Sequence, residues 1–237
     1  MYIALSDKLL LEFLSYNGLG SFDKQLISKL FKYLHPFKIG KYQLPLIDAS
    51  IAKQLLSGND FISTSSATTK DDLINDTLFK IMLTDDTTTY PYIDIMNDEI
   101  EINFNATYQS TIDRTKAQEH IKSLLKSSNK VSIYDKYFLK HWNSNCKLFK
   151  DSSNNSILAE DVKLTIYVDF NATNDLTFQL AEQGLKRIVN NPKIEKYNDS
   201  KMHDRYIETD KLRIILTSGL DYLENKRKDF TYIIKEK

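Results

Sequence analysis

The sequence of 237 residues is poor in cysteine, glycine, proline and tryptophan, and it carries no net charge. Its single cysteine, Cys146, excludes an internal disulfide and a thiolate-rich metal site. The 32 basic and 32 acidic residues balance. There is therefore no overall field to attract nucleic acid or an anionic membrane, and binding of either kind requires a local basic patch. The four histidines show no metal-ligand spacing, so we expect no metal and no cofactor.

Long hydrophobic runs are missing as well. The apolar stretch in "MYIALSDKLLLEFL" is short and interrupted by charge, which excludes a signal peptide or a membrane span. Hydrophobic residues make up 41% and charged residues 27% of the sequence, as is typical of soluble globular proteins. The length suits one large domain or two small ones. We therefore expect a cytoplasmic protein.

The sequence of residues 1–110 predicts helices followed by a small sheet, and we expect this region to serve packing or assembly. "SDKLLLEFLSY" begins with a Ser/Asp cap, "SFDKQLISKLFKYL" has apolar residues at helical spacing, and "DASIAKQLL" follows as a third helix. Leu26, Leu30 and Phe31 are expected to be buried. A polar loop is expected over residues 63–72, before "TLFKIMLT" and "YPYIDI", which indicate a small antiparallel sheet.

Residues 111–237 alternate helices and strands, which favours an α/β layer. Helices are expected in "DRTKAQEHIKSLLKSS", where His120 is expected to be solvated, and in "NDLTFQLAEQGLKRIV". Strands are expected in "KVSIYD", "KLTIYVDF", "DRYIET", "LRIILT" and "FTYII". The residues of the second helix expected to point inward are Leu176, Leu180, Ala181, Leu185 and Ile188. The strand "KLTIYVDF" is expected to place Leu164, Ile166, Val168 and Phe170 on one side.

Residue types and spacing together suggest chemistry at "HDRYIETD", residues 203–210. In a strand, His203 and Arg205 share one face, since residues two apart point the same way. A neutral histidine is a nucleophile or proton carrier near pH 7, and a guanidinium grips phosphate oxygens in a bidentate manner. Asp210 follows in a turn, where a carboxylate would orient the imidazole. The same residues also fit the polar face of an ordinary strand.

The octapeptide resembles HxKxxxxD, the signature of the phospholipase D superfamily, with Arg205 in place of the lysine. The longer stretch "MHDRYIETDKLRIILTSGLDYL" is similar to one branch of that superfamily. This branch is the phospholipase-D-like C-terminal domain found behind MIT domains in ESCRT-associated proteins. "VSIYDKYF", residues 131–138, resembles the early strand and aspartate turn of the same branch. The resemblance covers residues 111–237 and implies a phospholipase-D-like mixed sheet flanked by helices.

Active members of the superfamily bring two such motifs together. The resemblance therefore implies His203 as nucleophile or acid, Arg205 as phosphate clamp and Asp210 as orienting carboxylate, within a homodimer because this chain has one motif. Two departures favour a catalytically silent module. Arginine is larger and flatter than lysine, and "SGLD", which contains Asp221, stands near the place of the usual Gly-Ser-x-Asn. The MIT-linked branch shares these departures and is regarded as a binding module.

Two functions stay open. One is a module that binds a phosphate-bearing ligand or a protein partner within a multi-protein complex, with prokaryotic antiviral defence as a fold-level association. In such a module we expect Arg205 to pair with Asp135 or Asp221. The other is a homodimeric, metal-independent phosphodiesterase or nuclease.

Two further basic stretches could each either bind phosphate or have no role in binding. "YDKYFLKHW" is either a stacking and phosphate-binding surface that contains Lys136 and Lys140 or a surface helix anchored by aromatic residues. The loop "ENKRKD" either extends a phosphate site or is simply solvated. Both stretches lie within the part of the chain that resembles the phospholipase D superfamily.

Overall fold

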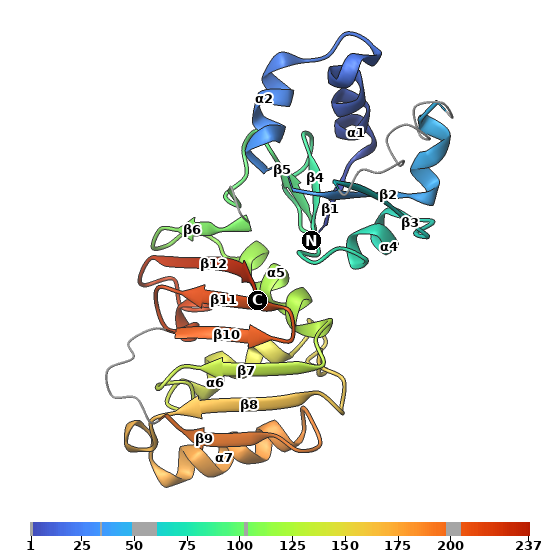
Figure 1. Ribbon diagram of the computed structural model, residues 1–237. Helices are drawn as coiled ribbons and strands as arrows, with labels where there is room; N and C mark the ends of the chain where they lie inside the picture. The colour runs from blue at the N-terminus through green and yellow to red at the C-terminus, as the bar shows by residue number, and fades with distance from the viewer. Residues whose placement is uncertain (1, 34, 49–60, 102–103, 198–204) are drawn as a thin grey trace. The chain divides into compact units, whose positions relative to one another are not determined.

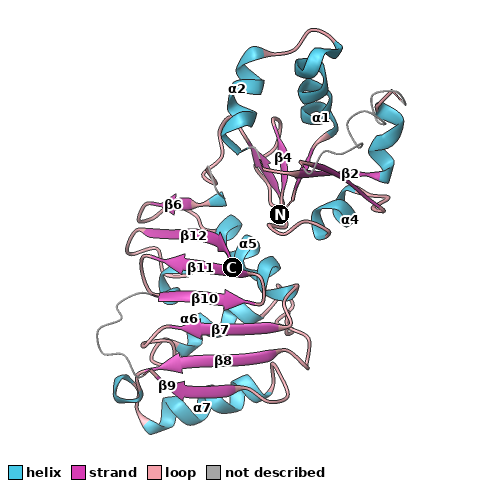
Figure 2. Cartoon of the chain, in the orientation of Figure 1, coloured by secondary structure: helices cyan, strands magenta, loops and turns pink. Residues whose placement is uncertain are grey.

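A computed structural model describes residues 2–33, 35–48, 61–101, 104–197 and 205–237. The chain divides into two compact units, Met1–Phe104 and Asn105–Lys237, and each has its own sheet (Figure 1). Both units combine helices with strands, which confirms the expected α/β class (Figure 2). None of the described helices is long and apolar enough to cross a bilayer.

The first unit is built around a five-stranded parallel sheet of order β3-β2-β1-β4-β5. The expectation of a small antiparallel sheet was wrong, since β4 and β5 pair in parallel. Short strands that lie mostly inside show no clear alternation of apolar and polar residues, so their sequence does not reveal strand direction. The strands are β1 (Ile3–Leu5), β2 (Phe37–Gly40), β3 (Ile62–Ser65), β4 (Met82–Thr84) and β5 (Tyr92–Asp94). The helices are α1 (Asp7–Leu14), α2 (Lys24–Tyr33) and α4 (Lys70–Asn75).

The first two expected helices are present. Ser6 caps α1, because its side chain accepts a hydrogen bond from a backbone amide of the first turn at 3.3 Å. Leu26 and Leu30 of α2 are buried as expected, but the expectation for Phe31 was wrong, since its side chain is 42% exposed. Phe31 packs edge-on against Tyr16 at the surface, with ring centroids 5.1 Å apart. The third expected helix lies almost wholly outside the described residues.

Residues 63–72, expected to form a loop, contain most of β3 and the start of α4. Their polar composition conceals both elements. Ser65 is buried in the strand, and its hydroxyl donates to the Asp76 carboxylate at 2.7 Å. Thr69 caps the helix, because its hydroxyl accepts a hydrogen bond from Asp72 N at 3.1 Å. Both hydroxyls therefore have local roles that composition alone does not show.

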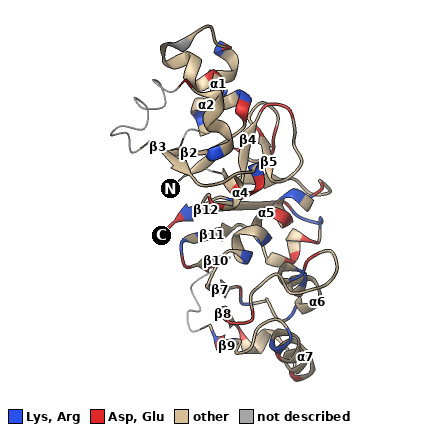
Figure 3. Ribbon diagram, turned by 90° about the vertical axis from the view of Figure 1, so that its right-hand side faces the viewer, with Lys and Arg blue, Asp and Glu red and all other residues tan. Residues whose placement is uncertain are grey.

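The second unit contains a seven-stranded mixed sheet of order β6-β12-β11-β10-β7-β8-β9. β8 pairs in parallel with both β7 and β9. The other neighbouring pairs, β7 with β10, β10 with β11, β11 with β12 and β12 with β6, are antiparallel. Figure 3 shows α5, α6 and α7 on one side of this sheet. The strands are β6 (Ala106–Tyr108), β7 (Lys130–Tyr134), β8 (Lys163–Val168), β9 (Lys193–Lys196), β10 (Arg205–Thr209), β11 (Leu212–Leu216) and β12 (Phe230–Glu236). The helices are α5 (Thr115–Lys126), α6 (Trp142–Asn145), α7 (Asp175–Lys186) and the short 3₁₀ helices η4 (Cys146–Phe149), η5 (Phe170–Ala172) and η6 (Leu220–Leu223).

Period-two alternation identifies the central strands of this sheet. Leu164, Ile166 and Val168 of β8 are the buried residues of that strand, so they share one side as expected. Phe170, expected with them, comes after the strand has ended and is 40% exposed. β10 and β11 are adjacent antiparallel strands joined at Asp210, which confirms the expected hairpin.

α7 packs against the unit through a narrower face than expected. Ala181, Leu185 and Ile188 are buried, but Leu176 and Leu180 are 67% and 54% exposed. The expectation that these two leucines point inward was therefore wrong. The two leucines stand four residues apart, so they share an outward face of α7.

His120 of α5, expected to be solvated, is buried. Its Nδ1 lies 2.9 Å from the hydroxyl oxygen of Tyr232, a buried residue of β12. The two side chains come from elements 112 residues apart, so the charged neighbours of His120 in the sequence gave a wrong indication of its surroundings.

Candidate anion-binding site

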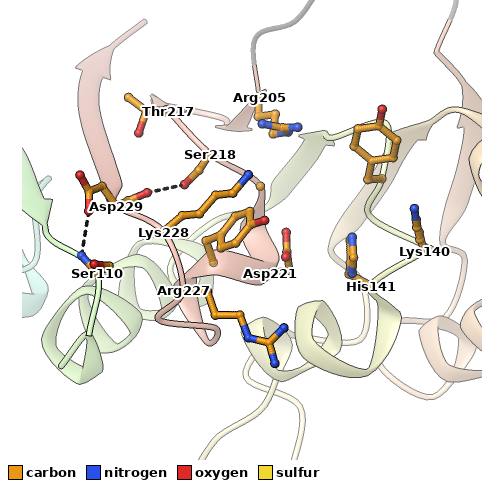
Figure 4. Close-up of a pocket in the computed structure, with 13 residues that line it drawn as sticks. Ser110, Lys140, His141, Arg205, Thr217, Ser218, Asp221, Arg227, Lys228 and Asp229 are labelled. Carbon is orange, nitrogen blue, oxygen red and sulfur yellow. Dashed lines mark hydrogen bonds between the residues drawn. The ribbon is translucent and has the colours of Figure 1, made fainter. Parts of the chain in front are cut away.

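A pocket of about 740 Å³ opens in the second unit beside the first residue of β10 (Figure 4). Its wall is built from segments that are far apart in the sequence, so the arrangement exists only in the folded unit. We call it the anion pocket. Its lining residues are Ser110, Tyr137, Lys140, His141, Arg205, Thr217, Ser218, Gly219, Asp221, Tyr222, Arg227, Lys228 and Asp229.

Basic side chains outnumber acidic ones among the described lining residues. Lys140, Arg205, Arg227 and Lys228 are basic, whereas Asp221 and Asp229 are acidic. The carboxylate of Asp229 accepts a hydrogen bond from Ser110 N at 2.8 Å, which partly satisfies it. Lys228 extends from one wall toward Arg205 on another (Figure 4). An excess of positive charge in a hollow surface concentrates field lines and attracts an anion.

Three cations lie near the ring of Tyr137, which lines the pocket. Its centroid lies 4.9 Å from Lys136 Nζ, 5.7 Å from Lys140 Nζ and 5.9 Å from Arg205 Cζ. Cations near an aromatic face are attracted by the quadrupole of the ring. Two of these three cations, Lys140 and Arg205, line the pocket together with Tyr137.

Asp135 lies behind this wall and is only 2% exposed. Its carboxylate accepts hydrogen bonds from Tyr137 N at 3.0 Å and Leu220 N at 3.2 Å, and Arg205 Nε lies 3.6 Å from its Oδ1. Burial raises the pKa of this carboxyl above its ordinary value; the two backbone bonds and Arg205 oppose the shift without cancelling it, and Asp221 adds to it. Asp135 thereby links the end of β7, the start of β10 and the corner after β11.

Arg205 is held in place by an ion pair, but not all of its hydrogen-bond donors are used. Its Nε is buried and makes no hydrogen bond within the described part of the chain. The 3.6 Å separation from Asp135 is an ion pair but too long for a hydrogen bond. The side chain is 25% exposed, and the guanidinium borders the pocket. A planar guanidinium in this position can donate two parallel hydrogen bonds to an oxyanion.

The corner after β11 brings a carboxylate close to the backbone. A Cβ atom at Gly219 would lie 2.3 Å from Asp221 Oδ1, so any other residue here would displace this carboxylate from its present position. Asp221 is 8% exposed and borders the pocket. Its carboxylate repels an anionic ligand on this side of the pocket.

A loop between η6 and β12 supplies the remaining basic wall. Arg227 and Lys228 are exposed there, and Lys228 Nζ lies 5.3 Å from the ring centroid of Tyr222. The pocket thus has a second aromatic ring with a cation beside it. This loop is the "ENKRKD" stretch, and its position shows that two of its basic residues border the pocket.

Arg114 holds the basic loop from inside the unit. Its side chain is 0% exposed, and its guanidinium lies 5.7 Å from the ring centroid of Phe230. Burial lowers the pKa of this guanidinium from its ordinary value, and the nearby Asp229 opposes that shift. The carbonyl oxygens that accept its hydrogen bonds belong to Gln109, Tyr222, Asn225 and Lys228.

The structure brings together some of the sequence-predicted site residues and separates others. Arg205 and Asp221 border the anion pocket, and Asp135 supports it from behind. Lys136 lies beside the Tyr137 ring. Asp210 follows the last residue of β10, roughly 16 Å along the strand direction from Arg205, and its carboxylate accepts a hydrogen bond from Asn129 N at 3.3 Å.

His203, the remaining residue of the motif, lies outside the described residues. Sequence reasoning did not assign a site role to Arg114, Tyr222 or His141. The basic run in "ENKRKD" indicated that this loop could contribute to a phosphate site. The sequence around Arg114, in contrast, does not distinguish it from a surface arginine. Among the described residues, no group of three or more His, Cys, Asp or Glu side chains is placed to hold a metal ion.

No protein-family model matches the sequence, and no curated protein matches it. Among solved structures, the chain is similar to TrmBL2, described as an archaeal chromatin protein with a novel mode of DNA binding. The similarity has a TM-score of 0.30 and 8% sequence identity, and it covers 54% of this chain and 45% of that chain. The chain therefore spans less than half the length of this neighbour.

Replacing Arg114 with methionine is expected to destabilise the second unit by about 3 kcal/mol or more, because several partly buried carbonyl groups lose their donor at about 1–3 kcal/mol each. Urea unfolding followed by the fluorescence of Trp142 measures this directly, since the only tryptophan of the chain lies in this unit. Arg213→Met is the matched control. That arginine is exposed and paired with Glu208, so its loss should cost less than about 1 kcal/mol. Equal effects of the two substitutions would contradict the role of Arg114.

The raised pKa of Asp135 predicts a pH dependence of stability. A raised pKa means that the folded unit holds this proton more tightly, so the contribution of Asp135 is fully present below its ordinary value of 3.8 and is lost as the pH rises. The free energy of unfolding of the wild type, relative to Asp135→Asn, should therefore fall as the pH rises above about 4. Urea titrations followed by Trp142 fluorescence would detect the change.

Asp113 provides the opposite case as a control. Its hydrogen bond with Lys226 lowers its pKa to about 2. Its contribution should be present above 3.8 and be lost as the pH falls toward about 2. Because the pair is exposed, the difference from Asp113→Asn should stay below about 1 kcal/mol. Identical pH profiles for Asp135→Asn and the wild type would show that Asp135 is not perturbed by burial.

Proposed function

We propose that the second unit is a binding module for a phosphate-bearing ligand, which it holds in the anion pocket. The observation that carries this proposal is the convergence of four basic side chains and two tyrosine rings on one pocket. Arg205 offers a planar fork for two phosphate oxygens, whereas lysines act as point charges. The tyrosine rings provide apolar surface for the rest of the ligand.

Charge and size both support a phosphate. The four basic and two acidic lining residues leave an excess of two positive charges, and a phosphate monoester carries about −1.5 to −2 at pH 7. The volume of about 740 Å³ exceeds that of a single phosphate and falls in the range of about 300–1,000 Å³ found for small-molecule sites. The ligand is therefore a phosphate joined to a larger group, such as a nucleotide.

The proposal can be tested by calorimetric titration with ATP and with pyrophosphate at low and high salt. We expect both probes to bind, and salt to weaken the binding because the contacts are ionic. The double variant Lys140→Ala, Lys228→Ala should lose at least about tenfold in affinity, since each hydrogen bond to a charged group contributes about 1.5–3 kcal/mol.

The control for this titration is Lys211→Ala, Lys235→Ala. These lysines are exposed and do not border the pocket, yet their removal changes the net charge by the same amount. The control should bind both probes as the wild type does. If neither probe binds, or if the two double variants weaken binding equally, the anion pocket is not the binding site.

Phosphodiester hydrolysis is a second candidate, which one observation favours. His141 borders the same pocket as Arg205, so an imidazole lies near the place proposed for the phosphate. The resemblance to the phospholipase D superfamily instead implies His203 as nucleophile or acid, within a homodimer. Hydrolysis of bis(p-nitrophenyl) phosphate in the presence of EDTA, lost in His203→Ala or His141→Ala, would replace the binding proposal by a metal-independent phosphodiesterase. We expect no hydrolysis.

A place in a multi-protein complex, a cytoplasmic location and a part in prokaryotic antiviral defence remain proposals. The complex and the role in defence rest on the resemblance of residues 111–237 to the phospholipase D superfamily, and the cytoplasmic location rests on the short, charge-interrupted apolar stretches of the sequence. Of the two partner classes expected from the sequence, the anion pocket favours the phosphate-bearing ligand over a protein.

A further inference from the structure

A second hollow of about 460 Å³ lies in the second unit, between α7 and the segment of α6 and η4. We call it the α7 groove. It shares no lining residue with the anion pocket within the described part of the chain. The lining residues that matter here are Trp142, Cys146, Lys150, Leu180, Gly184 and Arg187.

An apolar stripe leads along α7 into this groove. Leu176 and Leu180 are 67% and 54% exposed, and Gly184 follows Leu180 after four residues. Residues four apart on a helix lie above one another, so these three positions share one face. Ala181 and Leu185, on another face of α7, are buried. The exposed leucines therefore lie outside the face through which α7 packs against the unit.

An indole forms part of the floor of the groove. A Cβ atom at Gly184 would lie 2.3 Å from Trp142 Cζ2, so the indole rests directly against the backbone of α7. Trp142 remains partly exposed and packs edge-on against Phe138, with ring centroids 6.3 Å apart. Partly exposed tryptophans that are already held in place are frequent centres of protein interfaces.

The charge of the groove has one sign. Lys150 and Arg187 line it, and no Asp or Glu is among its described lining residues. An occupant that fits this surface needs apolar side chains for Leu176, Leu180 and Trp142, together with carboxylates for the two cations. The backbone of a nucleic acid would meet the charge but would gain nothing from the exposed leucines.

We propose that the α7 groove docks an amphipathic helix of a partner protein, with Leu, Ile or Phe anchors flanked by Asp or Glu. Helix-in-groove recognition uses apolar anchors at positions i, i+3, i+4 and i+7, and such anchors can pack along the stripe on α7, whose positions are four residues apart. The acidic residues of the partner would face Lys150 and Arg187. This interaction goes beyond the proposed ligand binding and does not depend on it.

The test is selection of random 16-residue peptides displayed on phage, with the full-length wild type as bait and Leu180→Glu as counter-selection. We expect enriched peptides with apolar residues at helical spacing and adjacent Asp or Glu. Their binding, measured by titration with Trp142 fluorescence, should weaken at least about tenfold in Leu180→Glu. It should also weaken in Arg187→Glu and at high salt.

Two control variants keep the outcome clear. Ile112→Glu places a charge on another exposed apolar residue of the unit, and Lys235→Glu reverses an exposed cation. Neither residue lines the groove, so both variants should bind the peptides as the wild type does. The double variant Lys140→Ala, Lys228→Ala should do so too, and loss of binding there would assign the peptides to the anion pocket and overturn the proposal.

Other outcomes would also overturn it. One is enrichment of peptides without the acidic and apolar pattern, or of peptides that bind Leu180→Glu equally well. Another is a dimer of the wild type in sedimentation velocity that Leu180→Glu converts to monomer, because the occupant of the groove would then be a second copy of this chain.

Discussion

The guanidinium of Arg114, buried at 0% exposure, donates hydrogen bonds to carbonyl oxygens of the segments around the anion pocket. Moving such an ion out of water costs several kcal/mol even after relaxation. Here the carbonyl dipoles and the nearby ring of Phe230 offset that cost. The backbone around Tyr222, Asn225 and Lys228 consequently has one favourable position. The basic wall of the pocket depends on this contact, although Arg114 itself does not line the pocket.

A buried carboxylate has the corresponding role on the other side. The carboxylate of Asp135 accepts hydrogen bonds from the backbone amides of Tyr137 and Leu220, and its Oδ1 lies 3.6 Å from Arg205 Nε. In both cases a buried charge is satisfied mainly by backbone groups, while the charges that border the pocket stay available to a ligand. Removing either buried group leaves several polar atoms without partners at once, which is more costly than loss of a surface ion pair.

Local patterns in the sequence predicted much of the second unit. Alternation along β8 and β10 and the apolar spacing in α5 identified these elements, because each pattern is complete within a few residues. Arg205 was also recognised as a candidate from its place in a short motif. Pairing between distant segments had no such signal. The contact of His120 with Tyr232 spans 112 residues, and nothing near Arg114 in the sequence indicates that it contacts a loop more than a hundred residues further on.

Two further failures have a different cause. The short buried strands of the first unit carry no alternation, so their parallel pairing was invisible. Leu176 and Leu180 have the spacing of a buried helix face but are exposed, and spacing cannot distinguish packing within a chain from packing against a partner.

A crystal structure of the protein grown with tungstate would show whether the anion pocket binds phosphate, because tungstate is a tetrahedral analogue of phosphate and its anomalous scattering gives its position. We predict a tungstate ion in the anion pocket, within hydrogen-bonding distance of the Arg205 guanidinium and of Lys140 or Lys228. Tungstate bound only at other surfaces, with the pocket empty in the same crystal, would contradict phosphate binding at Arg205.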